Sequence, residues 1–136
     1  MKTIRLIFIA ATLILGSMLV TSTVWAAPAG SITGHWTAVD PIDGDTVHMT
    51  LSGGNNGVYQ LSAFDLHAPL ACVETGGLAL LKGTAIFDES TGIITKTVVA
   101  SCPGEGITYP ENTLTMQYDS DTDTIYDPTF NLLYTR

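Results

Sequence analysis

Apolar and polar residues alternate with a period of two along much of the chain after residue 30, and this period is typical of β-strands with one buried face. In segment 45–52, Val47, Met49 and Leu51 fall on one face, and polar residues fall on the other. Segment 113–118 alternates in the same way. The period of an amphipathic helix is absent from this part of the chain, so the pattern predicts an all-β domain.

Clusters of glycine, asparagine, aspartate and serine separate the alternating segments and predict tight turns. The clearest turn is Gly-Gly-Asn-Asn-Gly at 53–57, and two further turns cover 88–92 and 119–123. Short strands at hairpin spacing predict a small up-and-down antiparallel β-barrel, with a small β-sandwich as the alternative. The predicted strands number about eight and cover 34–40, 45–52, 58–65, 82–87, 93–101, 113–118, 124–126 and 131–135.

The first 30 residues break this alternation and have the three regions of a secretory signal peptide. A basic start precedes an apolar run over 6–20, and the Val-Trp-Ala motif at 24–26 supplies a small-x-small cleavage site. A run of about 15 apolar residues is shorter than the roughly 20 that span a bilayer. We therefore expect removal of residues 1–26. Residues 27–136 then form one secreted domain, extracellular or periplasmic, with no membrane attachment.

The order of the predicted strands places the two longest connections together. In a meander, successive connections alternate between the two ends of the barrel, so 66–81 and 102–112 lie at the same end. These connections contain Cys72 and Cys102, the only two cysteines of the chain. Because two cysteines in a secreted domain imply one bridge, we expect a Cys72–Cys102 disulfide at this loop-rich end.

The first and last predicted strands resemble those of a known superfamily. Residues 31–37 contain Gly34 and Trp36 in a Gly-x-Trp motif, and the chain ends on Arg136. This pattern resembles the calycins, the superfamily of lipocalins and avidins, in which a basic residue of the last strand packs across that tryptophan. The resemblance implies a cation–π contact between Trp36 and Arg136 at the end opposite the long loops. Ala38 replaces the asparagine of the avidin ligand site, so biotin binding is not expected.

The charge of the expected mature domain argues against two classes of partner. All 13 acidic residues of the chain follow residue 26, and only Lys82, Lys96 and Arg136 are basic there. With 3 basic against 13 acidic residues, its formal charge is −10. A domain of this charge repels nucleic acid and anionic membrane surfaces.

Metal-ligating residues are present but do not form a recognised motif. The acidic turns 40–45 and 119–123 each contain three aspartates, and the second lacks the glycine and glutamate of an EF-hand. Hairpin turns account for both segments, although weak calcium binding at 40–45 stays open. His35 and His48 lie on adjacent predicted strands within reach of one metal, but a tight zinc site needs a third ligand. We therefore predict no cofactor and no metal site.

Segment 66–81 is very apolar for a connection at a solvated end of a barrel. We expect it to shape an apolar mouth, and the domain to be a non-enzymatic binding module for a small apolar or amphipathic ligand. The predicted ligand-binding residues are Leu66, Leu70, Leu78 and Leu80. A further strand, or a plug of the core, is the structural alternative for this segment.

Two other functions stay open. In the first, the two long connections bind another secreted or envelope protein, as an inhibitor or interaction module does. In the second, His67 and the mouth carboxylates Glu74, Glu105 and Glu111 form a hydrolase-like site. Because no motif that carries a nucleophile is present, no catalytic residue is assigned.

Overall fold

A computed structural model of the chain describes residues 31–69, 71, 72 and 77–136. Within these residues the structure is all-β, and its one helical turn is a 3₁₀ turn at Asn55–Gly57. The strands are β1 (Gly34–Val39), β2 (Thr46–Gly53), β3 (Val58–Asp65), β4 (Ala79–Asp88), β5 (Ile93–Cys102), β6 (Ile107–Thr108), β7 (Asn112–Asp119), β8 (Thr124–Asp127) and β9 (Leu132–Tyr134).

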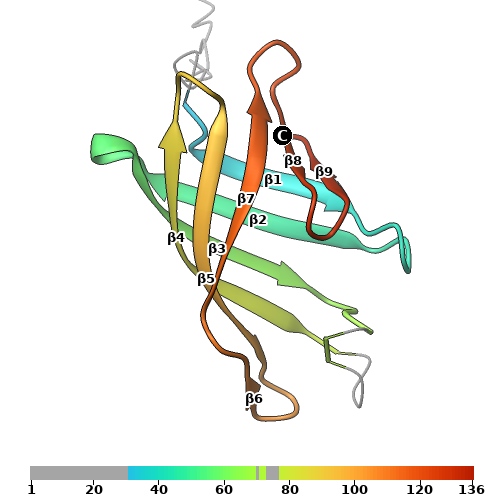
Figure 1. The fold of residues 1–136 in the computed structure, drawn as a ribbon. Helices are drawn as coiled ribbons and strands as arrows, with labels where there is room; N and C mark the ends of the chain where they lie inside the picture. Colours follow the sequence, from blue (N-terminus) through green and yellow to red (C-terminus); the bar gives the residue numbers. More distant parts are fainter. Residues whose placement is uncertain (1–30, 70, 73–76) are drawn as a thin grey trace, which may run out of the picture.

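The strands form one antiparallel sheet in the order β1-β2-β3-β4-β5-β7-β8-β9, and β6 adds only a short pairing with the end of β5. The sheet curls so that β9 returns to β1 (Figure 1). A single bridge joins these edges, with reciprocal backbone hydrogen bonds of 2.8 Å between Thr37 and Thr135. The prediction of an eight-strand up-and-down barrel is confirmed, and the barrel is nearly closed.

Two segments differ from the predicted strands. β4 begins at Ala79 rather than Lys82, because its pairing with β3 continues to the Asp65–Ala79 pair. The last residues of the apolar segment 66–81 are therefore part of the sheet. In the loop 102–112, β6 returns beside the end of β5. Both differences come from hydrogen bonds between distant segments, which a local pattern does not contain.

The barrel is filled by the inward-facing residues of alternating strands. The predicted inner face of β2 is confirmed, since Val47, Met49 and Leu51 are all buried. The most deeply buried large side chains are Ile32, Trp36, Leu51, Ile94, Met116 and Ile125. Three aromatic rings, of Phe87, Tyr118 and Trp36, meet edge to face in this core, with centroids 5.6 and 6.3 Å apart.

Gly83 allows the sheet to bend tightly between β4 and β5. A Cβ atom added at this position would lie 1.9 Å from the carbonyl oxygen of Thr97 on β5. Because no side chain fits in that space, a glycine is required where the two strands approach.

The plain end of the barrel, which carries the turns 53–57, 88–92 and 119–123, is closed by Arg136. Its guanidinium lies over the Trp36 ring, 4.4 Å from the ring centroid, which is the contact that the calycin resemblance implies. Its Nε and Nη2 atoms each donate a 2.7 Å hydrogen bond to the Asp123 carboxylate, and Nη1 donates to the Thr33 carbonyl oxygen. The Trp36 indole N–H donates to the Ile32 carbonyl oxygen.

The opposite, loop-rich end contains both cysteines, as predicted. Cys72 and Cys102 form a disulfide with their Cα atoms 5.5 Å apart. A disulfide is consistent with an oxidising compartment. The predicted signal peptide and its cleavage site lie outside the described residues. Within the described residues, no helix has the length and apolar character needed to cross a membrane.

Candidate functional site

The predicted ligand-binding leucines lie at the loop-rich end, and the structure brings three of them together. Leu66 follows the last residue of β3, Leu78 directly precedes β4, and Leu80 is its second residue. The Asp65–Ala79 pair sits between them in the sheet register. Leu66 and Leu78 are exposed and Leu80 is half-buried, so they lie on the outer face of the sheet. Leu70 lies outside the described residues.

Phe64 completes this apolar surface, and the sequence analysis did not select it. Phe64 pairs with Leu80 across β3 and β4, and it faces outward in the alternation of β3. The exposed fractions are 37% for Phe64, 55% for Leu66 and 37% for Leu78. An aromatic residue at an outward position was the signal that could have identified it. We call Phe64, Leu66, Leu78 and Leu80 the rim patch.

The chain beside the rim patch is held by covalent and hydrogen bonds. The disulfide is buried with Ala68 and Ala79 in a small apolar cluster of its own. The Ala68 N–H donates a 3.1 Å hydrogen bond to the Gly77 carbonyl oxygen. From the second loop, the Tyr109 hydroxyl donates to the Ala71 carbonyl oxygen. The two long connections are therefore tied to each other as well as to the barrel.

A row of stacked rings continues the outer face across β1, β2 and β3. His48 stacks on Phe64 with ring centroids 4.7 Å apart, and His35 stacks on His48 at 5.3 Å. The Nε2 atom of His35 lies 3.2 Å from Nδ1 of His48, so the two histidines share a hydrogen bond. The described residues contain no group of three or more His, Cys, Asp or Glu residues placed to hold a metal ion.

Acidic side chains surround the loop-rich end. The Asp45 carboxylate contacts Nδ1 of His67, and the backbone N–H of His67 donates to Asp65 at 3.0 Å. Burial raises the pKa of Asp65, and the negative charges of Asp43 and Asp40 raise it further. The partner of His67 is therefore Asp45 on the adjacent turn, which the sequence analysis did not identify.

The predicted hydrolase residues are only partly described. Glu74 lies outside the described residues, and Glu105 lies in the turn that precedes β6. Glu111 lies beside an outer hollow on the β3–β5 face. His67 is largely exposed, and Asp45 is half-buried. A hydrolase-like function stays a prediction.

The barrel interior contains a buried ion pair that the sequence analysis missed. Lys96 on β5 contacts the carboxylate of Asp127 at the end of β8, and the exposed fractions of the two residues are 3% and 0%. Burial raises the pKa of the nearby Tyr134 hydroxyl, and the negative charges of Asp127 and Asp65 add to that shift. The signal was available in the alternation of β5, since Lys96 falls between the buried Ile94 and Val98.

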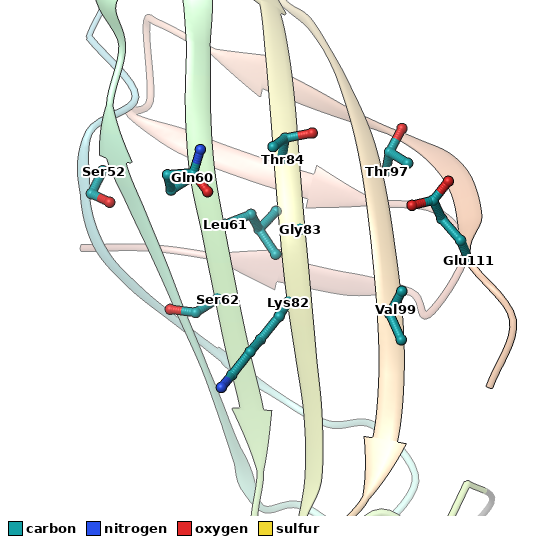
Figure 2. Close-up of a pocket in the computed structure, with 10 residues that line it drawn as sticks. All are labelled: Ser52, Gln60, Leu61, Ser62, Lys82, Gly83, Thr84, Thr97, Val99 and Glu111. Carbon is teal, nitrogen blue, oxygen red and sulfur yellow. The ribbon is translucent and has the colours of Figure 1, made fainter. Parts of the chain in front are cut away.

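Two hollows lie on the outside of the described structure. The larger, of about 530 Å³, lies over β3, β4 and β5 around Gly83 (Figure 2). Hydroxyl and amide side chains line it, with Lys82 and Glu111 on different sides of the view. The second, of about 440 Å³, lies at the incomplete closure between β1 and β9. Neither hollow is lined by the inward-facing residues at the loop-rich end.

Comparisons of the chain with protein-family models, with curated proteins and with solved structures find no match.

Proposed function

We propose that this domain is a non-enzymatic binding module that holds another protein through its rim patch. The observation that carries the proposal is the position of the patch. Four apolar side chains on adjacent strands gather on the outer face at one end of a barrel that already has its own core. Exposed apolar surface that is edged by polar groups marks interaction sites on soluble proteins.

The construction of the rim favours binding without reorganisation. The disulfide and the Tyr109–Ala71 hydrogen bond hold the loops beside the patch. The ring of His48 supports Phe64 from the adjacent strand. A surface that is ordered before binding loses less conformational entropy when a partner arrives. The rim patch is therefore suited to serve as the anchor of an interface.

The charge around the rim patch indicates the chemistry of the partner's contact surface. Asp40, Asp43, Asp45 and Asp65 lie at the same end of the barrel. Of the basic residues, Lys96 is buried and Arg136 is paired with Asp123 at the opposite end. Lys82 is exposed on β4 two residues from Leu80, so one basic residue faces four acidic ones near the patch. We infer a partner protein whose contact surface carries apolar side chains among basic residues. Charge complementarity of this kind speeds association and makes it dependent on salt concentration.

Three further points stay proposals: that the protein is secreted, that it is a calycin, and that it binds a small ligand. The disulfide supports the first, and the contact between Arg136 and Trp36 supports the second. A small apolar ligand ranks behind a protein partner, because the three described leucines that were expected to line a mouth lie on the outer face.

Random peptides displayed on phage test the chemistry of the partner. Selection against the mature domain should enrich peptides that combine basic with aromatic or aliphatic residues. Calorimetric titration of one such synthetic peptide should show saturable binding that weakens as salt increases. Leu66→Asp and Leu78→Asp should each weaken this binding at least about tenfold, because buried anchor residues dominate interface energies.

Ile86→Asp is the matched control. Ile86 is 57% exposed on the outer face of β4, but it lies towards the plain end of the barrel. This variant should leave peptide affinity unchanged. Equal losses from Leu66→Asp and Ile86→Asp would contradict the proposal. Selection of acidic peptides, or the absence of any saturable binder, would also contradict it.

A further inference from the structure

We propose that Lys96 and Asp127 join in an intramolecular amide bond inside the barrel. The Nζ atom of Lys96 contacts the Oδ2 atom of Asp127, and both side chains are buried. The residues are 31 positions apart in the sequence. They lie on β5 and β8, which β7 separates in the sheet. The bond would therefore link strands that no ladder of backbone hydrogen bonds joins directly.

Amide formation requires the uncharged forms of both groups, and the fold removes the pair from water. An ion pair removed from water loses most of its hydration, and the cost can exceed the attraction between the charges. The neighbours of Lys96 on the inner face of β5, Ile94 and Val98, are buried and apolar. Transfer of one proton from Nζ to Oδ2 leaves a neutral amine against a neutral carboxylic acid.

The contact geometry assigns the two oxygens of Asp127 to different roles. Oδ1 accepts a 3.0 Å hydrogen bond from the Thr129 N–H, while Oδ2 faces the amine. The amine nitrogen attacks Cγ, and the negative charge that develops on Oδ1 is stabilised by that N–H. The bond from Cγ to Oδ2 then breaks. Oδ2, its proton and one proton from nitrogen leave as water, so the reaction needs no oxidant or other reactant.

The fold lowers the barrier to this condensation by holding the two groups in contact. Groups held in a reactive orientation behave as if they were present at very high concentration, roughly 10⁵–10⁸ M for well-oriented pairs. Burial of the site also limits the water that would reverse the reaction.

A tryptic digest of the reduced and alkylated mature protein tests the bond. Trypsin cleaves after lysine and arginine, and after residue 82 the chain offers only Lys96 before its end. Without the amide bond, the digest contains peptides 83–96 and 97–136. With it, Lys96 is not cleaved, and a single product covering 83–136 appears with its mass lowered by one water molecule. Fragmentation should place the link between Lys96 and Asp127.

Lys96→Arg provides the control, because arginine keeps both the cation and the cleavage site but forms no such amide. This variant should yield the two separate peptides at full mass. The wild-type readout requires no variant to fold, so it decides the question alone. Two peptides at full mass from the wild type would overturn the proposal, as would an uncleaved 83–136 product that retains the water.

Discussion

The side chains at the two ends of the barrel differ in what they contact. At the plain end, Arg136 stacks on Trp36 and hydrogen-bonds with Asp123 and with the backbone of the segment that leads into β1. At the loop-rich end, the rim patch is partly exposed in the described structure, and a disulfide holds the chain beside it. The first end is stabilised by contacts within the domain. At the second end, a disulfide holds the chain beside an apolar surface that stays partly exposed within the described residues, and this arrangement supports the proposed binding site.

Removing the disulfide should produce the largest effect and weaken the loop-rich end. Cys72→Ala combined with Cys102→Ala should lower the free energy of unfolding by about 3–4 kcal/mol, because the bridge closes a loop of 30 residues. Denaturant titration of the mature domain measures this change. Addition of reductant to the wild type should reproduce it and should leave the double variant unaffected. Equal stability of the two proteins would mean that the bridge does not hold the rim.

Arg136→Ala should weaken the plain end by about 2 kcal/mol through loss of the cation–π contact and the hydrogen bonds to Asp123. Trp36 is the single tryptophan after residue 26, so its emission reports on this end. The emission should shift to longer wavelength as the ring becomes hydrated. Arg136→Lys should fall between the wild type and Arg136→Ala, because lysine keeps the charge but not the two-pronged geometry. An unchanged spectrum and melting curve for Arg136→Ala would show that the contact does not close the barrel.

The pH dependence of stability should have opposite signs at the two ends. Hydrogen bonding to Arg136 lowers the pKa of Asp123, so its contribution is present above the usual aspartate range and is lost as pH falls through the lowered pKa. Burial raises the pKa of Asp65. Its contribution is therefore present below the usual aspartate range and is lost as pH rises through the raised pKa.

Asp123→Asn should consequently lower the melting temperature at pH 7, by an amount corresponding to about 1 kcal/mol or less because Asp123 is partly exposed. Asp65→Asn should raise the melting temperature at pH 7 by a few degrees at most, while keeping the oxygen that accepts the His67 N–H. The Asp65→Asn difference should vanish at pH about 2, where a carboxyl with a raised pKa is protonated. The Asp123→Asn difference should shrink as pH falls through the lowered pKa of Asp123. Melting temperatures of both variants between pH 2 and pH 7 measure the effect, and shifts of the same sign would contradict the contrast between the ends.

Much of the architecture was predictable because its signals are local or follow from strand order. The alternation identified the inner face of β2, and the order of hairpins placed Cys72 and Cys102 at the same end. The contact between Trp36 and Arg136 followed from the resemblance to calycins, and the meander places both residues at the same end. The site was predictable only in part. Leu66, Leu78 and Leu80 were identified as a group, while Phe64 and the direction in which the group faces were not.

The sequence by itself determined an all-β meander with two unlike ends. The alternation of apolar and polar residues and the lengths of the connections are local features that can be identified in the sequence. Tertiary structure decided how far β4 extends, which face carries the leucines, and that Lys96 meets Asp127 inside the barrel. Each of these depends on the register between strands. Register is set by hydrogen bonds and packing between residues far apart in the sequence, and a shift of one residue would exchange the inner and outer faces.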